Sequence, residues 1–327
     1  MRRATRIRKK AASQRRPLHL VLPATSANLG PAFDAAALAF EIYLTLDARP
    51  AAEYSIQARG RDSDICGKVE NHLILDTYRE VLETAGKTRV PLALKIANDI
   101  PIGKGCGSSA AARLAGIALA DHFGALRWTD NQIVGEASRR EHHPDNASAC
   151  WMGGLTVARM SGESEAQIAQ IKPKGKWPLL LAIPPESLAT EEARRVLPGQ
   201  YSRADAVTNI QNSMLLLAAF VQGKGEFLAS ALEDRMHQPY RARLCPLLPA
   251  LQELAGTQGI LGVALSGAGP SVLVFLDPHA RMPAKKIAAR VAAHLKQKQL
   301  PAELLMTAFA KKGARASRYS KREPKNP

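Results

Sequence analysis

Hydrophobic residues along this chain follow two spacings, which predict where strands and helices lie. Apolar positions spaced by two indicate short strands, and positions spaced by three or four indicate helices. Strands are expected at residues 18–22, 43–48, 54–58, 92–97, 155–160, 179–183, 262–265, 271–276 and 304–309. Helices are expected at residues 71–85, 107–123, 129–141, 191–197, 204–221, 226–236 and 284–297. Because strands and helices mix without strict β–α alternation, the pattern predicts an α+β fold.

The length of the chain favours two domains. It has 327 residues, 46% of them hydrophobic, which is enough for two cores of ordinary size. Breaks in the pattern between about residues 160 and 180 suggest the boundary. We therefore expect one domain at 17–165 and a second at 166–310. The apolar runs fall well short of the roughly 20 residues that a membrane-spanning helix needs.

The net charge of +16 is concentrated at the two ends of the chain. Residues 1–16 carry eight Lys and Arg and no acid, and residues 311–327 carry seven and one acid, so these ends hold fourteen of the sixteen charges. Such a pattern predicts two basic disordered tails on a nearly neutral body. Weak contact with RNA or another anion is one role for the tails, and simple solvation is the other. The four cysteines are far apart in sequence, which favours free thiols and a cytoplasmic location.

The richest segment for chemistry is Pro101-Ile102-Gly103-Lys104-Gly105-Cys106-Gly107-Ser108-Ser109-Ala110-Ala111. Glycines let a backbone turn tightly, and a helix that starts after them directs its N–H groups and positive dipole end at an anion. The segment is neither a Walker A loop nor a dinucleotide fingerprint, because its glycines do not match either spacing. It predicts a phosphate site, with close helix packing as the alternative.

Three segments together resemble the homoserine kinases, a branch of the GHMP kinases. Residues 23–34, Pro-Ala-Thr-Ser-Ala-Asn-Leu-Gly-Pro-Ala-Phe-Asp, are similar to the first motif of that branch. Residues 101–111 resemble the second, ATP-binding motif of the superfamily, and residues 265–271, Leu-Ser-Gly-Ala-Gly-Pro-Ser, resemble the third. The order and spacing are those of the family, and the resemblance covers most of the chain between its ends.

Shorter matches point to the same branch. They are His143-Pro144-Asp145-Asn146, Thr190-Glu191-Glu192-Ala193-Arg194, and Asp234 to Arg241. Departures are Ala37 for a common glycine, Cys106 for the usual leucine, and Ala147-Ser148-Ala149 for a Val-Ala-Pro or Ile-Ala-Pro segment. We expect these to alter packing around the substrate pocket and its selectivity.

The resemblance implies the GHMP kinase fold, with an N-terminal ribosomal S5 domain 2-like domain and a C-terminal ferredoxin-like domain. It also implies ATP-dependent phosphorylation of the small molecule L-homoserine, in threonine biosynthesis, with Mg²⁺. Two alternatives stay open. One is a GHMP-type kinase for another small polar alcohol, and the other is a basic RNA-binding protein. A homodimer is also left open.

The ATP and Mg²⁺ residues that the resemblance implies come mainly from the glycine segment. ATP contacts are expected from Pro101, Gly103, Lys104, Gly105, Gly107, Ser108, Ser109 and Ala110. An exposed, solvated side chain is the alternative for Lys104. The metal ligands are expected to be Ser109 and Glu136. Glu136 lies in an apolar-leaning helical stretch, where an unpaired buried carboxylate needs a metal or a basic partner, and an exposed position is the alternative.

Homoserine has a carboxylate, an ammonium and a hydroxyl group, which need partners of different charge. We expect Arg194 and Arg241 to bind the carboxylate, since guanidinium groups pair with carboxylates through two hydrogen bonds. Asn28 and Asp34 are expected to hold the ammonium and hydroxyl ends, with the pair His143 and Asn146 close by. Asp34 is the candidate catalytic base, assisted by Asn28, although orientation alone is enough in a loose transition state.

The segment around His143 has two other interpretations. A structural hydrogen bond between His143 and Asp145 is one of them. The second is a zinc site made by Glu141, His142, His143 and Asp145. We discount zinc because Pro144 breaks the helical spacing and no Cys or His pair completes a site.

Overall fold

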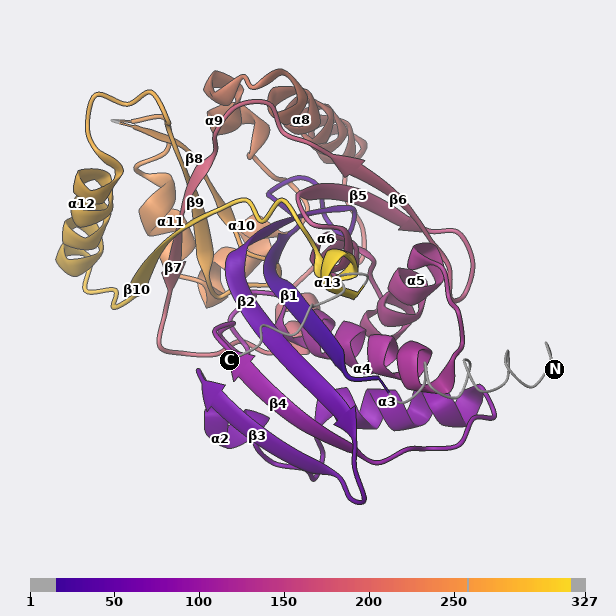
Figure 1. The fold of residues 1–327 in the computed structure, drawn as a ribbon. Helices are drawn as coiled ribbons and strands as arrows, with labels where there is room; N and C mark the ends of the chain where they lie inside the picture. Colours follow the sequence, from indigo (N-terminus) through magenta and orange to yellow (C-terminus); the bar gives the residue numbers. More distant parts are fainter. Residues whose placement is uncertain (1–15, 258, 319–327) are drawn as a thin grey trace.

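The computed structural model of the chain, which describes residues 16–257 and 259–318, contains two β-sheets flanked by helices (Figure 1). The predicted α+β class is confirmed. The rest of the two basic ends, residues 1–15 and 319–327, lies outside the described residues. Among the helices that are described, none is long and apolar enough to cross a membrane.

The first sheet is built around one long strand, β2 (Ala36–Pro50). Its other strands are β1 (Leu18–Ala27), β3 (Ser55–Gly60), β4 (Leu92–Asn98), β5 (Leu155–Met160) and β6 (Ala166–Ile171). Strand β2 pairs along its length with β1 and, on its other edge, with β4 and then β5, all antiparallel. Strand β3 lies parallel to β4 at one edge, and β6 closes the other. The polar segment after Ala27 thus leaves the sheet beside the start of β2, where Ala27 pairs with Ala37.

Five helices accompany the first sheet in sequence. They are α2 (Ser63–Cys66), α3 (Leu73–Thr84), α4 (Ser108–Gly124), α5 (Asp130–Glu141) and α6 (Asp145–Met152). Helix α5 starts where the sequence predicts, because Thr129 and Gln132 form a capping box. Helix α4 is buried over most of its length, and its small residues permit this: a Cβ at Gly116 would lie 2.5 Å from the carbonyl oxygen of Ile74 in α3. The helix that follows the glycine segment is therefore held firmly in the core.

The second sheet is antiparallel, with strand order β10-β7-β9-β8. Its strands are β7 (Pro178–Ile183), β8 (Ile260–Leu265), β9 (Val272–Leu276) and β10 (Glu303–Ala308). Alternate residues of β9 face opposite cores, as the two-residue period of a strand requires. One face packs with α8 (Arg203–Gln222), and the other with α11 (Leu247–Gln252) and α12 (Ala284–Gln297). In Figure 1 α12 covers the outer side of this sheet.

The main hydrophobic core is shared by both sheets. It contains Phe40 of β2 and Phe275 of β9, together with Phe220 of α8. A single β-bridge between Phe40 and Phe309 also joins the two halves. Short elements complete the second half: α7 (Thr190–Arg195), α9 (Leu228–Ala231), α10 (Gln238–Arg241), and the 3-10 turns Gly225–Phe227 and Ala242–Leu244.

Several sequence predictions differ from the structure. The helix expected at 226–236 is only the short α9 after a 3-10 turn, because the Asp234 carboxylate accepts three backbone N–H groups and begins a new turn. Strand β6 and helix α6 were not predicted. The boundary expected between residues 165 and 166 lies inside the β5–β6 hairpin, so a division that follows the sheets comes after Ile171.

The C-terminal segment expected to be disordered from residue 311 is ordered as far as the structure describes it. Helix α13 (Ala314–Arg318) contacts β1 and α6. Ala314 is fully buried, and the backbone N–H of Val21 in β1 donates to the hydroxyl of Ser317 at 3.0 Å. These contacts bury the apolar positions of a segment whose charges alone suggested a solvated tail.

Candidate active site

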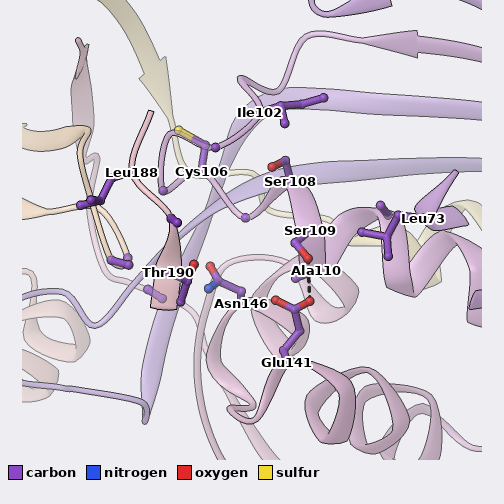
Figure 2. Close-up of a pocket in the computed structure, with 18 of the residues that line it drawn as sticks. Leu73, Ile102, Cys106, Ser108, Ser109, Ala110, Glu141, Asn146, Leu188 and Thr190 are labelled. Atoms are coloured by element: carbon purple, nitrogen blue, oxygen red, sulfur yellow. Dashed lines mark hydrogen bonds between the residues drawn. The ribbon is translucent and has the colours of Figure 1, made fainter. Parts of the chain in front are cut away.

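The glycine segment borders a cavity of about 400 Å³ where the two halves of the chain meet. Figure 2 shows side chains from both halves around it, with Leu73 and Ile102 on one side and Leu188 and Thr190 on the other. Ser108 and Ser109, at the start of α4, lie between these two sides. The cavity therefore has an apolar part bordered by α3 and a polar part bordered by α7.

The three glycines of the segment are required by their backbone conformation and by close neighbours. Gly103, Gly105 and Gly107 have φ of 70°, 72° and 72°, in the left-handed region where a side chain is strained. A Cβ at Gly105 would lie 2.2 Å from the carbonyl oxygen of Ser266, and one at Gly107 would lie 1.9 Å from Oγ1 of Thr25. Close packing against the other two motifs therefore requires glycine at these positions, in addition to the access that a phosphate needs.

The carbonyl groups of the segment are oriented by donors from three other parts of the chain. The carbonyl oxygens of residues 103–106 accept, in order, from Leu188 N at 3.2 Å, Ser271 N at 3.4 Å, Ser266 Oγ at 2.8 Å and Thr25 N at 3.1 Å. The N–H groups in the first turn of α4 have no partner within the helix. A helix N-terminus of this kind is a favourable place for phosphate oxygens. Lys104 is not simply solvated, because its Nζ donates to the carbonyl oxygen of Pro185 at 2.5 Å.

Ser109 lies beside a carboxylate, but the carboxylate belongs to Glu141. The Ser109 hydroxyl donates to Oε1 of Glu141 at 2.7 Å, as Figure 2 shows, and Nε of Arg113 donates to the same oxygen at 2.5 Å. Glu141 is the last residue of α5 and borders the cavity. A hydroxyl and a carboxylate oxygen are the hard donors that Mg²⁺ favours.

The prediction that Glu136 joins Ser109 is wrong. Its carboxylate accepts from Arg139 at 2.9 and 3.0 Å and from Arg140 at 2.8 Å, and it borders a different depression, beside Trp128. Burial alone would raise the pKa of Glu136, but the two arginines lower it below its usual value. The expected need for a charged partner is met, but by neighbours on its own helix. The sequence signal that could have identified Glu141 as a site residue is its position just before the His143 segment.

Asp34 and Arg194 form an ion pair across the polar part of the cavity. Nη2 of Arg194 donates to Oδ1 of Asp34 at 2.8 Å, and Nη1 donates to Oδ2 at 3.1 Å. Asp34 follows β1 in the first half of the chain, whereas Arg194 lies on α7 in the second. The side chains expected to bind opposite charges on the substrate therefore meet each other.

Asn28 positions Asp34 and also contacts the third motif. Its Oδ1 accepts from the backbone N–H of Asp34 at 2.9 Å, and its Nδ2 donates to the carbonyl oxygen of Gly267 at 2.9 Å. Both Asn28 and Asp34 have positive φ, of 70° and 53°, which short polar side chains tolerate by bonding to nearby backbone. The sequence prediction brought both residues to one site, and the structure places both at the cavity.

Arg241 is a buried cation at the edge of the cavity. It is 1% exposed, and it forms hydrogen bonds with the carbonyl oxygens of Ala193 at 3.0 Å and Gly267 at 3.4 Å and with the ring of His237 at 3.2 Å. Among the residues that the structure describes, no carboxylate forms an ion pair with it. Burial, and next the charge of Arg194, lowers the pKa of Arg241 to about 10. Arg241 therefore differs from Arg194, whose charge is paired with Asp34.

His143 and Asn146 are brought to the same end of the cavity. Nδ1 of His143 lies 2.6 Å from Oδ1 of Asp145, which confirms the structural hydrogen bond considered for this pair. Burial alone would lower the pKa of His143, but the Asp145 carboxylate raises it above its usual value. Asn146 accepts from the hydroxyl of Thr25 at 2.7 Å, so a residue of the first motif orients it. Side-chain atoms of Asp34, His143 and Asp145 all lie within 4.8 Å of one another.

Comparison with known proteins shows which family the chain resembles. The family model for the N-terminal domain of GHMP kinases matches residues 72–154, and the model for their C-terminal domain matches residues 216–297. A homoserine kinase from Solibacter usitatus is 43% identical over 259 residues, which cover 79% of this chain and 85% of the relative. One from Synechocystis sp. is 37% identical, with coverage of 78% and 85%.

The fold has also been seen in solved structures. A homoserine kinase from Cytophaga hutchinsonii superposes with a TM-score of 0.76 at 21% sequence identity. The match covers 91% of this chain and 96% of that one. At this identity the likeness concerns the fold.

Proposed function

The chain belongs to the GHMP kinases and, among them, to the homoserine kinases, and from this premise we propose that it phosphorylates the side-chain hydroxyl of L-homoserine with ATP. The products are O-phospho-L-homoserine and ADP. We further propose that the product enters threonine biosynthesis, the role that the family resemblance implies.

The observation that carries the proposal is the buried Arg241, which has no carboxylate partner among the described residues and lies beside the Asp34–Arg194 ion pair. An amino acid brings one carboxylate and one ammonium group. Its carboxylate would supply an anionic partner for Arg241, and its ammonium would replace Arg194 as a partner of Asp34. Buried charges are stable only when paired, so these charges favour a zwitterionic substrate over an uncharged alcohol.

We assign the ATP phosphates to the glycine segment and the start of α4. Magnesium, which the family implies, fits the oxygen pair of Ser109 and Glu141, because Mg²⁺ uses few protein ligands and takes the rest from phosphate and water. When bound, it would neutralise charge on the phosphates. The apolar part of the cavity, with Leu73 and Ile102, is left for the nucleotide base.

The residues of the polar part orient the acceptor. In the reaction the homoserine oxygen forms a bond to the γ-phosphorus as the bond to the β–γ bridging oxygen breaks, and the hydroxyl proton leaves. We propose that Asp34 holds this hydroxyl and accepts its proton, while Asn28 holds Asp34 in place. Since phosphoryl transfer proceeds through a loose transition state, most of the rate is expected from orientation and charge neutralisation.

The test is a purified enzyme supplied with Mg-ATP and, separately, L-homoserine, threonine, shikimate and mevalonate, with ADP release as the readout. We expect turnover of homoserine at a kcat/KM at least about 100-fold above the others, the discrimination that buried polar groups can supply. Turnover of another alcohol without turnover of homoserine would overturn the substrate assignment.

We keep the division into two domains as part of the proposal. In it, a first domain ending at Ile171 supplies the phosphate site, and a second domain supplies the two arginines. The catalytic site lies where they meet.

A further inference from the structure

One histidine lies behind the substrate arginine, fully buried and outside the cavity lining. His237 has 0% exposure, and its ring contacts two groups of the site. Nε2 lies 2.7 Å from the carbonyl oxygen of Gly30, and Nδ1 lies 3.2 Å from Nη1 of Arg241. Neither the three sequence motifs nor the proposed reaction assigns a role to His237.

The two contacts determine which ring nitrogen carries the proton. A carbonyl oxygen only accepts, so Nε2 must be the donor to Gly30. An arginine only donates, so Nδ1 must present its lone pair to Nη1 of Arg241. Both conditions hold only for a neutral ring with its proton on Nε2. Burial lowers the pKa of His237 to about 4, which agrees with a neutral ring. The Asp234 carboxylate opposes this shift, and the charge of Arg241 adds to it.

The ring is itself held from three sides. The carboxylate of Asp234 accepts from the backbone N–H of His237 at 2.8 Å, which fixes the start of α10. Phe33, from the first motif, stacks on the imidazole with ring centroids 5.3 Å apart and an interplanar angle of 26°. The Gly30 contact ties the other end of the ring to the same motif. The position of Nδ1 is therefore set by residues from both halves of the chain.

This contact is one of three hydrogen bonds that fix the rotation of the guanidinium group. Nε of Arg241 donates to the carbonyl oxygen of Ala193, and Nη1 points to His237 and Gly267. Nη2 has no hydrogen-bond partner among the described residues, and the side chain borders the cavity. The edge left for a ligand is thus the one that the protein does not use.

We propose that His237 is a positioning residue: through Nδ1 it orients Arg241 so that the free edge of the guanidinium group receives the carboxylate of the substrate. The inference rests on the proposed function, since it names the group that sets the affinity of that site for an amino acid. His237 does not touch the substrate, and its effect is exerted on carboxylate binding alone.

Two variants of similar size separate this role from packing. Both His237→Asn and His237→Gln remove the ring that stacks on Phe33. Asparagine places an amide oxygen near the position of Nδ1 and keeps an acceptor for Arg241, whereas glutamine extends to the position of Nε2 and keeps a donor for Gly30. We expect the homoserine KM to rise about tenfold or more in His237→Gln and less than threefold in His237→Asn, because only the glutamine variant loses the charge-assisted hydrogen bond to Arg241. The ATP KM should change little in either.

A substrate without a carboxylate supplies the second readout. For 3-amino-1-propanol, which keeps the ammonium and hydroxyl groups of homoserine, kcat/KM should be low in the wild type and the same in both variants. Equal increases of the homoserine KM in the two variants, or an equal loss of kcat/KM with 3-amino-1-propanol, would show that the ring acts through packing and would overturn the inference. So would wild-type kinetics in His237→Gln.

These outcomes are distinct from failure of the proposed function. The wild-type enzyme is assayed first, and absence of homoserine phosphorylation there would refute the activity itself. If the wild type is active and folded variants, checked by thermal unfolding, do not separate, only the role of His237 is refuted.

Discussion

A glutamine substitution at Glu141 is expected to lower activity, whereas one at Glu136 is expected to lower stability. The two carboxylates lie five residues apart, at the end and in the middle of α5. Glu141 accepts from the Ser109 hydroxyl at the cavity, whereas Glu136 is bound by Arg139 and Arg140 elsewhere. Each change removes one negative charge and almost no volume, so each serves as the control for the other.

The magnitudes follow from these contacts. Loss of the anionic magnesium ligand that we propose at Glu141 should lower kcat/KM for ATP by about 100- to 1000-fold, comparable to removal of one electrostatic contact in a transition state. Glu136 accepts three guanidinium hydrogen bonds. The side chain of Arg139 is 46% exposed, so solvent screens its contribution to the unfolding free energy. We expect Glu136→Gln to cost about 1–3 kcal/mol of unfolding free energy, which lowers Tm by roughly 2–6 °C.

Acid should remove the difference in stability between wild type and Glu136→Gln. The pKa of Glu136 is lowered in the folded protein, so its stabilisation is present above its usual value of 4.5 and is lost as the pH falls through the lower folded pKa. Thermal unfolding between pH 7 and pH 3 measures this convergence. Steady-state kinetics over a range of Mg²⁺ concentrations measures the expected loss of activity in Glu141→Gln. A fully active Glu141→Gln enzyme, or a Glu136→Gln enzyme with altered magnesium dependence, would refute the assignment.

Three further predictions concern the substrate, the loop and the C-terminal helix. Arg241→Ala should raise the homoserine KM about 30-fold or more while the ATP KM stays within threefold, and equal effects on both would count against carboxylate binding. Gly107→Ala should lower Tm and raise the ATP KM, whereas Gly86→Ala, with positive φ but open space around it, should cost only about 1 kcal/mol in unfolding experiments. Ala314→Asp should cost about 2–4 kcal/mol of unfolding free energy, and the exposed Ala316→Asp less than about 0.5, so similar losses would contradict the packing of α13.

The parts of the site carried by short contiguous motifs could be predicted from the sequence. The glycine segment fixes its own geometry, because glycine is needed wherever φ is positive and neighbours are close. Asn28 and Asp34 lie within one loop, so their proximity was also readable. Arg194 and Arg241 were identified through resemblance, and the structure places both at the cavity.

The error at Glu136 has a physical origin in the sequence. A buried carboxylate needs a partner, and the family resemblance pointed to a metal as the partner of Glu136. Arg139 and Arg140 stand three and four positions later, which is the spacing at which helical side chains meet. That spacing was the available signal. The contact between Ser109 and Glu141, by contrast, joins residues 32 positions apart and depends on how α4 packs against α5.

The misjudged segments are those whose structure depends on tertiary contacts. The apolar spacing of residues 226–236 favours a helix, but Asp234 binds the backbone ahead of it and starts a separate turn. Charge dominated the interpretation of residues 311–318, although a few small residues were enough to seat α13 against β1. Charge patterns describe solvation, and they do not reveal which small side chains find a matching surface.

The contact between Gly105 and the third motif limits how this enzyme can change by mutation. A Cβ at residue 105 would lie 2.2 Å from the carbonyl oxygen of Ser266 and 2.7 Å from that of Gly269, and those carbonyls belong to the backbone whatever side chains stand there. The nucleotide loop therefore tolerates a larger residue only if the backbone of a segment some 160 positions later moves as well. Neither half of the chain can be transplanted alone as a phosphate-binding module, because the surface that shapes the loop would stay behind.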